Sequence, residues 1–525
     1  MKNRLWGLEI PLGGSSDEEA LRRLAARGLG IRIEALSVLR VVRKSLDARR
    51  GRRVPAWVFT VDLEMRDRPT RIAGGLRLGP IPDPPTASAA PSRTLGGVRA
   101  VVVGTGPSGL FAAEAFALRG ASVTVLEQGP PLEGRVSAVA GLWRAGELHP
   151  DANVQFGEGG AGTFSDGKLT TRIKDPLSRE VLRRFARAGA PESILEEAHP
   201  HLGTDGVRRV VRSMRGQIEG LGACFHFRRP LLDLSPQGRG WRLSTPDGPL
   251  DADVVVLAVG HSSRDLARRL VALGVPFRAK GFAVGVRAEH PQNWVDGRQY
   301  GKFAGHPDLA PAEYFLTFSD EETGRGVYSF CMCPGGLVVN SASEEGHLVT
   351  NGMSMSHRAS GFANAGIVVT VRPEDFGADP LNGLSFQEDM EARGYALGGG
   401  GYKAPAQSAA AFLENRTDPH PLRTSFRPGT RNVNLRGFFP DWVEGPLVRA
   451  LARFDRTMPG FVERGVLLAP ETRTSSPMQV LRSESGEPPG FPGLLLVGEG
   501  AGWSGGIVSS AVDALRVVEA WARSR

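Results

Sequence analysis

A run of valines that leads into a glycine-rich turn constrains this chain more than any other feature. Residues 99–129 read RAVVVGTGPSGLFAAEAFALRGASVTVLEQG: an apolar strand, the spacing GxGxxG, a helical apolar pattern and a second strand. Gly104 is expected to form the tight turn, Gly106 to let backbone N–H groups approach a pyrophosphate, and Gly109 to let the helix pack on the strand. This order predicts a Rossmann-like dinucleotide-binding unit.

The residues beside this turn supply further predicted contacts. Glu127 ends the second strand, where its carboxylate could accept hydrogen bonds from both ribose hydroxyls and would repel a 2′-phosphate. Arg135 follows closely enough in the chain to reach the pyrophosphate. Apart from the three glycines, the predicted contacts of this region are Pro107, Ser108, Glu127, Gln128, Gly129 and Arg135.

The composition is that of a globular protein with several domains. The chain has 525 residues, of which 41% are hydrophobic and 23% charged, so two or three domains with sizeable cores are expected. We recognise no secretory signal and no apolar stretch long enough to cross a membrane, and expect a cytoplasmic protein without membrane contact. The three cysteines show no metal-ligand spacing, and no metal site is expected.

Residues 1–78 are predicted to form a small α+β domain of their own. Three segments have strand patterns and one has a helical pattern, in the order Leu5–Ile10 (strand), Asp17–Ala26 (helix), Ala35–Ser45 (strand) and Ala56–Glu64 (strand). Residues 79–96 are rich in Pro, Ala and Ser and are predicted to be a linker. The basic turn of residues 43–53 could dock a protein partner or a phosphate, although such a turn is more often a solvated hairpin tip.

A glycine-rich segment follows the dinucleotide-binding unit. Residues 153–171 read NVQFGEGGAGTFSDGKLTT, with five glycines and few bulky side chains. A loop of this kind typically lies against a flat or charged group, and its small polar residues suit a flavin ring and ribityl chain. A flexible lid is the alternative. The predicted cofactor contacts are Gly160, Gly162, Thr163, Ser165 and Lys168.

Two later segments extend the same predicted sheet. Residues 253–261, DVVVLAVGH, form a buried strand that ends at Gly260, and residues 493–506, GLLLVGEGAGWSGG, form a strand and turn before a helix over Ile507–Trp521. Glu499 is expected to bond the ribityl chain, while N–H groups at the helix start face the pyrimidine edge of the flavin. Three such elements in this order predict non-covalent FAD, with contacts from Gly260, Gly498, Glu499, Gly505, Gly506 and Ile507.

The predicted fold is therefore α/β, with a Rossmann-like FAD-binding domain over residues 97–279 and 472–525. Residues 280–471 are predicted to be an inserted, largely antiparallel substrate domain, because their apolar runs alternate at period two. Within this insert, Pro334-Gly335-Gly336 predicts a hairpin turn. No second GxGxxG unit follows a strand, so NAD(P)H is expected only as a transient donor or acceptor.

Residues that carry out chemistry are harder to assign than residues that bind the cofactor. Arg287 and Arg473 are preferred for holding an anionic group of a small-molecule substrate, because a guanidinium binds a carboxylate through two hydrogen bonds. His290 is a candidate acid or base. Each has a structural alternative, since histidines near strand ends are usually satisfied internally and arginines usually form ion pairs.

Cys331 and Cys333 are the pair most easily taken for a redox centre. Residues two apart on a strand point the same way, so both thiols are expected on one face, with Phe330 and Met332 on the other. Their CxC spacing also lacks the helix N-terminus that lowers the thiolate pKa in CxxC proteins. We predict two free thiols that pack beside the substrate pocket, with a dithiol relay to the flavin as the alternative.

These motifs resemble a family of uncharacterised bacterial FAD-dependent dehydrogenases over nearly the whole chain. The shared phrases include SLDARR, GTGPSGLFAA, NVQFGEGGAGTFSDGKLTTR, LAVGHSSRD, VGVRAEHPQ and GEGAGWSGGI. The resemblance implies a glutathione-reductase-type FAD fold, a ferredoxin-like N-terminal domain and oxidoreductase activity. It supplies no substrate.

We therefore expect a dehydrogenase or reductase that transfers a hydride between FAD and an organic, small-molecule substrate, an anionic one if the two arginines bind it. Two other classes stay open. A flavin-dependent enzyme that modifies tRNA would use the net charge of +8, although the positive residues are scattered rather than gathered in a stripe, which makes nucleic acid the less favoured partner. A flavin-bearing binding or sensor protein without turnover would dock a protein partner through its N-terminal domain.

Overall fold

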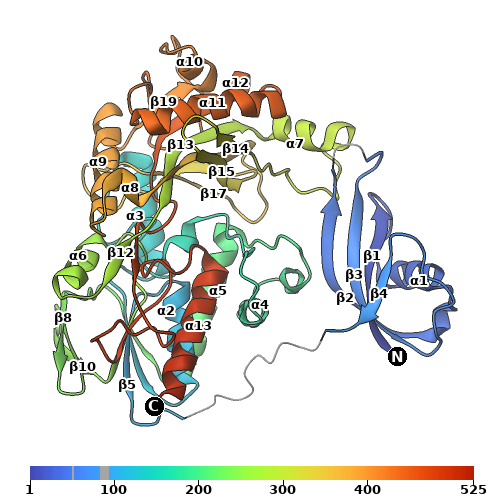
Figure 1. The fold of residues 1–525 in the computed structure, drawn as a ribbon, viewed down its shortest axis with the longest axis horizontal. Coiled ribbons are helices and arrows are strands. Elements are labelled where there is room, and N and C mark those ends of the chain that lie inside the picture. Colours follow the sequence, from blue (N-terminus) through green and yellow to red (C-terminus); the bar gives the residue numbers. More distant parts are fainter. Residues whose placement is uncertain (50–51, 83–93) are drawn as a thin grey trace.

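The computed structural model describes residues 1–49, 52–82 and 94–525. A small N-terminal sheet domain stands to one side of a larger body that contains two main sheets (Figure 1). The chain builds most of the first sheet by residue 257, forms the second sheet between residues 282 and 471, and returns to the first at residue 494. This path confirms the predicted α/β fold with an inserted antiparallel domain.

The N-terminal domain is a four-stranded antiparallel sheet with one covering helix. Its strands lie in the order β2 (Leu36–Asp47), β3 (Ala56–Met65), β1 (Lys2–Pro11) and β4 (Arg77–Pro80), and the helix is α1 (Glu18–Leu29). The sequence missed β4, which has four residues and includes Gly79 and Pro80. The described segment 66–76 between β3 and β4 contains no helix, so the second helix of a complete ferredoxin-like unit is not formed there.

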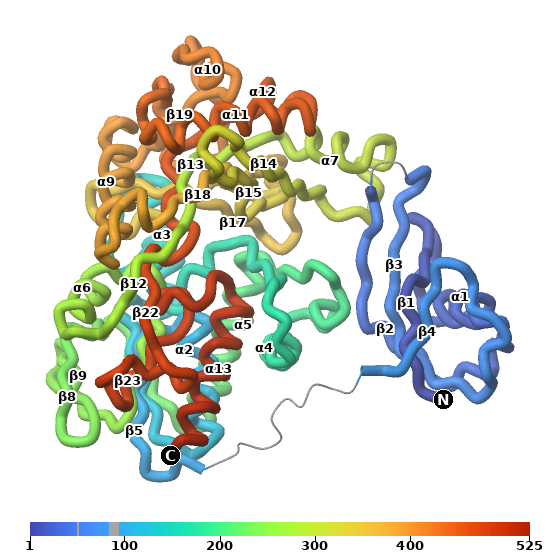
Figure 2. Tube along the Cα trace, viewed as in Figure 1, coloured from blue at the N-terminus to red at the C-terminus, as the bar shows by residue number. Residues whose placement is uncertain are grey.

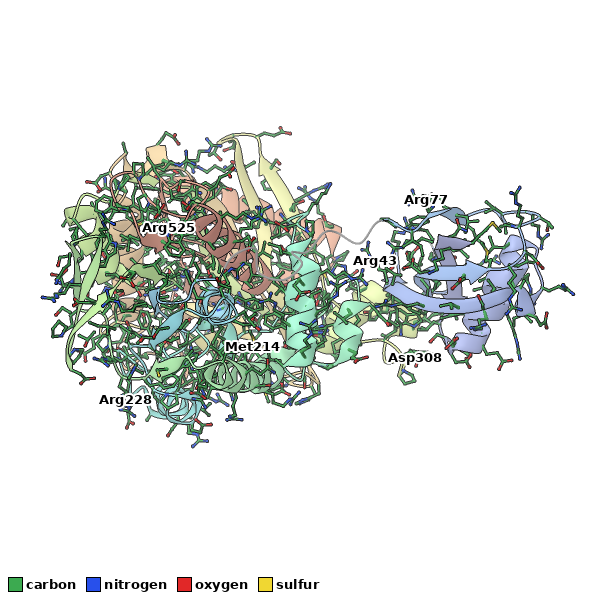
Figure 3. All side chains as sticks on the ribbon, turned by 90° about the horizontal axis from the view of Figure 1, so that it is seen from below. Arg43, Arg77, Met214, Arg228, Asp308 and Arg525 are labelled. Atoms are coloured by element: carbon green, nitrogen blue, oxygen red, sulfur yellow. The ribbon has the colours of Figure 1, made fainter. Side chains whose placement is uncertain are left out.

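The N-terminal domain contacts the body through its β2 edge. The backbone N–H of Lys44 donates to the carbonyl of Glu196 at 2.7 Å, and the N–H of Ala198 donates to the carbonyl of Lys44 at 2.9 Å. The neighbouring Arg43 lies on the side of the sheet that faces the body (Figure 3). Arg50 and Gly51 of the basic turn, and residues 83–93 of the predicted linker, lie outside the described residues.

The first sheet of the body is parallel and has five strands. Their order is β23 (Leu494–Leu496), β11 (Val254–Leu257), β5 (Arg99–Val103), β6 (Ser122–Leu126) and β7 (Cys224–His226). Alternate residues face opposite layers: Val102 and Val256 pack against helices, whereas Val101 and Val255 pack against a second, smaller sheet. Both faces are therefore buried, which explains the continuous apolar runs in the sequence.

Helices cover one face of this parallel sheet and an antiparallel layer covers the other. The helices are α2 (Pro107–Ala117), α4 (Leu177–Arg187), α5 (Gly203–Gly220) and α13 (Ile507–Arg523). The opposite layer contains β8 (Asp233–Gln237), β9 (Gly240–Thr245), β10 (Gly248–Ala252) and α6 (Arg264–Ala272). A further helix, α3 (Leu132–Ala145), precedes the glycine-rich segment. Among the described residues, none of the helices combines the length and apolar character needed to traverse a bilayer.

The insert is built on a seven-stranded sheet that is antiparallel except for its last pair of strands. The order is β14 (Thr317–Asp320), β15 (Arg325–Cys333), β18 (Phe362–Val371), β13 (Phe282–Pro291), β21 (Val466–Glu471), β19 (Ala404–Ser408) and β20 (Thr430–Asn432). Its helices are α7 (Gln292–Tyr300), α8 (Pro373–Phe376), α9 (Asn382–Leu397), α10 (Ala409–Leu413), α11 (Asp441–Thr457) and α12 (Phe461–Arg464).

Two short strand pairs complete the body. β12 (Phe277–Ala279) pairs with β22 (Met478–Val480) where the chain enters and leaves the insert, as Figure 2 shows. β16 (Leu337–Asn340) pairs with β17 (Thr350–Met353). The predicted hairpin at Pro334-Gly335-Gly336 is therefore wrong: β15 pairs with β14 and β18, so this turn carries the chain from one sheet into another.

Replacing Gly109 by Ala should lower the free energy of unfolding by about 1–3 kcal/mol, because overpacked sites lose stability of this order. An added Cβ would lie 1.9 Å from the carbonyl oxygen of Gly104, and backbone would have to move. Gly216→Ala in α5 is the matched control: its Cβ meets nothing within 4 Å, and Ala stabilises a helix by about 0.5–1 kcal/mol relative to Gly. Urea denaturation measures both. Equal stability of the two variants would contradict the close packing of α2 on β5.

Candidate functional site

A cavity of about 840 Å³ lies between the parallel sheet and the insert. One side is formed by the segments that follow β5, β6 and β11, and the other by insert residues that include Phe330, Cys331 and Asn351. Open α/β sheets bind ligands at the carboxyl ends of their strands, and a volume of this size is typical of a ligand pocket. The cavity is thus the candidate site.

The three glycines of the turn after β5 have different reasons to be glycine. Gly104 has a φ of +100°, and a Cβ there would lie 2.5 Å from the carbonyl oxygen of Ala258. Gly109 is required by its contact with Gly104. Gly106 differs, because a Cβ there would meet only the Cα of Gly160, at 3.8 Å. The protein leaves open space at Gly106 on the cavity side, which fits a pyrophosphate that approaches the backbone.

Glu127 lies at the end of β6 and lines the cavity with Gln128. Its carboxylate accepts hydrogen bonds from the N–H groups of Thr105 (3.1 Å), Gly129 (3.0 Å) and Gly157 (3.2 Å), and from the Thr105 hydroxyl at 2.5 Å. These four donors occupy about as many acceptor positions as a carboxylate has. Glu127 therefore fixes two loops against each other, and a ribose hydroxyl would share an oxygen with a protein donor.

Arg135 holds the glycine-rich segment from beneath instead of facing the cavity. Its fully buried guanidinium donates to five backbone carbonyls, those of Asn153, Val154, Gly157, Glu158 and Gly160, at 2.6–3.1 Å. The prediction that Arg135 contacts the pyrophosphate is therefore wrong. Its donors are used to hold the backbone of the glycine-rich segment. Gly129 also lies off the cavity wall, and a Cβ on it would meet Gly157 at 2.5 Å.

The glycine-rich segment brings four of its five predicted contacts to the cavity, namely Gly160, Gly162, Ser165 and Lys168. Thr163 is buried and donates to the carbonyl of Glu158. Lys168 Nζ lies 3.2 Å from Asp166 and 3.0 Å from Glu313. Burial opposes its charge, but these two carboxylates outweigh burial and raise the pKa of Lys168.

The turn between β23 and α13 also lines the cavity. Glu499 lines the cavity, and its carboxylate lies 3.2 Å from His261 Nδ1. Gly505, Gly506 and Ile507 also line it, and Ile507 begins α13. The first N–H groups of a helix have no partners within the helix and carry partial positive charge, which suits the pyrimidine edge of a flavin. Gly498 lies behind this wall, because a Cβ on it would meet the Ser108 hydroxyl oxygen at 2.2 Å.

Two of the three predicted catalytic residues lie away from the cavity. Arg287 is fully buried and pairs with Glu471 at 2.7 Å. His290 is also buried, with Nε2 2.9 Å from the carbonyl oxygen of Phe461 and its ring stacked on Trp294. Burial lowers the pKa of His290 to about 4. The structural alternative thus accounts for both residues, and neither is placed to contact a substrate in the cavity.

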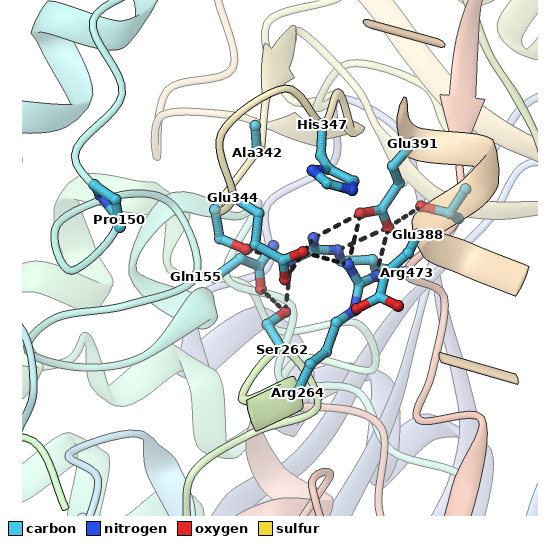
Figure 4. Close-up of polar contacts among 12 residues, drawn as sticks. Pro150, Gln155, Ser262, Arg264, Ala342, Glu344, His347, Glu388, Glu391 and Arg473 are labelled. Carbon is cyan, nitrogen blue, oxygen red and sulfur yellow. Dashed lines mark hydrogen bonds and ion pairs between the residues drawn. The ribbon is translucent and has the colours of Figure 1, made fainter. Parts of the chain in front are cut away.

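Arg473 does reach the cavity, but a carboxylate of the protein already holds it. Its Nε and Nη2 donate to Glu391 at 3.0 and 2.7 Å, and its Nη1 donates to Ser262 and Ser343 at 3.0 and 2.6 Å. Arg264 binds the other side of Glu391 through two hydrogen bonds at 2.8 and 3.0 Å. Figure 4 shows both guanidinium groups directed at the carboxylate of Glu391. This Arg264–Glu391–Arg473 cluster joins α6, in the layer that covers the parallel sheet, to α9 of the insert.

The cavity also contains residues that the sequence analysis did not select. His261, Ser262 and Arg264 follow β11 directly, and the rule that ligands bind at strand carboxyl ends could have found them. Gln155 lines the cavity and accepts from Ser262 at 3.2 Å. Phe330 lines the cavity from a distorted part of β15, for which the sequence pattern carries no signal, and Cys331 beside it was predicted to lie next to the substrate pocket.

Comparison with protein families gives matches along the chain. Residues 281–474 match a family described as FAD-dependent protein, C-terminal domain-like. Residues 177–328 match the family FAD dependent oxidoreductase, and residues 102–144 match an NAD(P)-binding Rossmann-like domain. Residues 3–63 match a domain of unknown function. A protein of Clostridium beijerinckii, described as uncharacterized, is 44% identical over 426 residues, which is 80% of each chain.

Among solved structures, the chain is similar to glycine oxidase from Geobacillus kaustophilus, with 12% identity over 81% of this chain and 95% of that chain and a TM-score of 0.34. A halogenase PltM bound to phloroglucinol and FAD has 11% identity over 81% and 70% of the two chains, with a TM-score of 0.40. A geranylgeranyl bacteriochlorophyll reductase-like protein from Thermoplasma acidophilum has 13% identity over 81% and 78%, with a TM-score of 0.37.

Replacing Gly106 by Val should remove most of the bound FAD and leave the protein folded. Protein atoms leave room for a Cβ at this position, so the added methyl groups extend to where the pyrophosphate would lie. Absorbance of the purified variant measures its flavin content, and its melting temperature should match that of the parent apoprotein. A variant that keeps full flavin occupancy would show that the phosphate site is elsewhere.

Replacing Glu391 by Gln should lower the free energy of unfolding by about 3–5 kcal/mol, because two buried guanidinium groups would lose their buried counter-ion and keep only the partly exposed Glu344 in common. Glu388→Gln on the same helix is the control: it pairs mainly with the partly exposed Arg268 and lies as far as 4.0 Å from Arg264, so the loss should stay below about 1 kcal/mol. Burial alone would raise the pKa of Glu391, but Arg473 and Arg264 hold it well below its ordinary value. The difference between parent and variant should therefore be largest at neutral pH and shrink in acid.

Proposed function

The chain belongs to a family of FAD-dependent oxidoreductases, and we propose that it transfers a hydride between bound FAD and an organic small molecule. The observation that carries this proposal is the continuity of the cavity. One space extends from the glycine turn at Gly106 to the insert residues Phe330 and Asn351. A cofactor held at the first end would therefore have room for a substrate beside it at the second.

The chain offers three sets of groups to the FAD. Backbone N–H groups around Gly106 and at the start of α2 would hold the pyrophosphate, and Glu127 would lie beside the ribose. Glu499 and the first N–H groups of α13 would face the ribityl chain and the pyrimidine edge. When bound, the isoalloxazine supplies the two-electron chemistry of the reaction.

The substrate end of the cavity is lined by an aromatic ring, a thiol, an amide and hydroxyls, from Phe330, Cys331, Asn351, Ser165 and Ser343. The anionic substrate suggested by Arg287 and Arg473 finds less support, because both guanidinium groups bind carboxylates of the protein. Lys168 is likewise paired with Asp166 and Glu313. We therefore propose a substrate that the wall holds by packing and neutral hydrogen bonds.

NADH or NADPH, if used, is proposed to bind only in passing over the flavin. The glycine turn after β5 is where a dinucleotide would bind in a Rossmann-like unit, and FAD takes that place here. A nicotinamide cofactor would therefore have to enter the substrate end of the cavity. Two cations of the lining, Arg473 and Lys168, are already paired with carboxylates of the protein and would not be free to bind its phosphates.

Anaerobic mixing with alcohols, amines and other organic metabolites, followed by flavin absorbance, tests this proposal. We expect saturable bleaching of the oxidised flavin by one class of compound, whereas NADH and NADPH should show weak saturation or none. Phe330→Ala should raise the half-saturating concentration about 10- to 150-fold, because a buried aromatic contact is worth about 1.5–3 kcal/mol, and should keep FAD bound. Tight stoichiometric binding of NADH or NADPH without substrate would overturn the proposal.

A further inference from the structure

Cys331 faces the cavity and Cys333 lies directly behind it, in contrast to the equal placement predicted from strand alternation. Cys331 lines the cavity and is partly exposed, whereas Cys333 is fully buried. The pairing of β15 with β18 shifts between Phe330 and Cys333, and Cys331 has a φ of +44°. This β-bulge breaks the alternation, so the two thiols occupy different depths. A non-glycine residue with positive φ is uncommon and costs backbone energy.

A buried guanidinium lies under the two cysteines. Arg287 Nη2 donates to the carbonyl oxygen of Cys331 at 2.7 Å and lies 3.5 Å from the sulfur of Cys333. The same guanidinium is fixed by Asn364 and by Glu471, which is buried on β21. Arg287 was selected from the sequence as a substrate ligand, but the structure places it behind the thiols.

The charged groups around Cys331 favour its thiolate. The Cys333 thiol donates to the carbonyl oxygen of Cys331 at 3.3 Å. The nearby Cys333 thiol favours the Cys331 thiolate, the positive charges of Arg287 and Lys168 add to this effect, and Asp166 opposes it. Burial also opposes the charge, but the pKa of Cys331 is lowered to about 6. On β21, Glu471 faces Arg287, and burial raises the pKa of this carboxyl to about 7. The surroundings of the cavity-facing sulfur thus favour its thiolate form.

We propose that Cys331 and Cys333 form a dithiol that reduces a small organic disulfide bound in the cavity, with Cys331 as the attacking thiolate and Cys333 as the resolving thiol. This names a substrate class for the cavity, and in that respect it rests on the proposed function. The exchange itself needs only the two cysteines and the disulfide. Cys331 contacts the substrate, whereas the buried Cys333 resolves the mixed disulfide.

The exchange takes two steps. The Cys331 thiolate attacks one sulfur of R–S–S–R′, a bond forms between Cys331 and R–S, and R′–S⁻ leaves and takes up a proton. The Cys333 sulfur then loses its proton and attacks Cys331, which forms the Cys331–Cys333 disulfide and releases R–S⁻. The dithiol is oxidised by two electrons and the substrate disulfide is reduced to two thiols. Turnover then needs a two-electron reductant, and a reduced flavin in the same cavity belongs to that chemical class.

The environment favours the second step only after the first has occurred. While Cys331 is a thiolate, its hydrogen bond and its charge raise the pKa of Cys333 and keep that thiol protonated. Formation of the mixed disulfide removes the negative charge from Cys331. Arg287, 3.5 Å from the Cys333 sulfur, would then stabilise the second thiolate. The order of attack is thus set by the positions of the two sulfurs relative to the cavity and to Arg287.

The aromatic disulfide DTNB tests the proposal on the FAD-loaded full-length protein in a Cys224→Ser background, since Cys224 is exposed and lies on β7, outside the cavity. The parent should release one thionitrobenzoate in the attack and a second in the resolution, and mass spectrometry should find the chain lighter by two hydrogens. Cys333→Ser should release only the first and keep the adduct. Cys331→Ser should release neither at the fast rate.

The pH dependence and flavin content separate the possible failures. The rate of the first release should rise as the pH increases through about 6 and then level off, because the thiolate is the attacking form. Equal release from the parent and the Cys333→Ser variant, or unchanged fast release from Cys331→Ser, would overturn the dithiol proposal. If the disulfide exchange fails in one of these ways while the parent protein keeps FAD and shows saturable flavin reduction by another organic compound, the proposed function stands and only this inference fails.

Discussion

The buried carboxylate of Glu391 determines how the two main layers of the protein meet. It lies between Arg264, at the start of α6, and Arg473, just after β21, and is fully buried. Removing a carboxylate from water is costly unless its partners are in place, so any slip between the layers would leave a buried charge unpaired. The ion cluster therefore acts as a strong constraint on register, whatever its net contribution to stability. Because Arg473 also lines the cavity, the same contact positions the insert wall over the flavin site.

The parts of the fold that the sequence predicted well depend on short-range physics. The roles of Gly104 and Gly109 follow from clashes with carbonyls inside one strand–turn–helix unit or on the adjacent strand end. The same holds for the turn before α13, where a strand, an acid and two glycines lie within 14 residues of sequence, from Gly493 to Gly506. Such units place their backbone N–H groups with little help from the rest of the chain, so FAD could be inferred before any tertiary contact was known.

The site residues that the sequence analysis assigned wrongly have partners that are distant in the sequence. Arg287 meets Glu471 across 184 residues, and Arg473 meets Glu391 across 82. A sequence shows that a cation is present but does not show whether a carboxylate of the protein already binds it. The role of Arg135 was missed for a similar reason. Its partners are five backbone carbonyls, which come together only when the glycine-rich loop folds around the guanidinium. The position of Cys331 depends on a bulge that alternation cannot predict.

The cations that the sequence suggested as substrate ligands are paired with carboxylates of the protein, and this pairing determines which groups the cavity offers to a substrate. Arg287, Arg473 and Lys168 all have acidic partners, so at the insert wall around Phe330 and Asn351 an incoming group is met mainly by hydroxyls, an amide and one thiol. The net charge of +8 therefore does not by itself make the cavity a binding site for anions. A paired guanidinium keeps its field, however, and at Arg287 that field acts on the sulfur atoms at the insert wall. The arginine that the sequence suggested as a substrate ligand thus becomes a positioning residue, whose charge contributes to the lowered pKa of Cys331, the thiol that does reach the cavity.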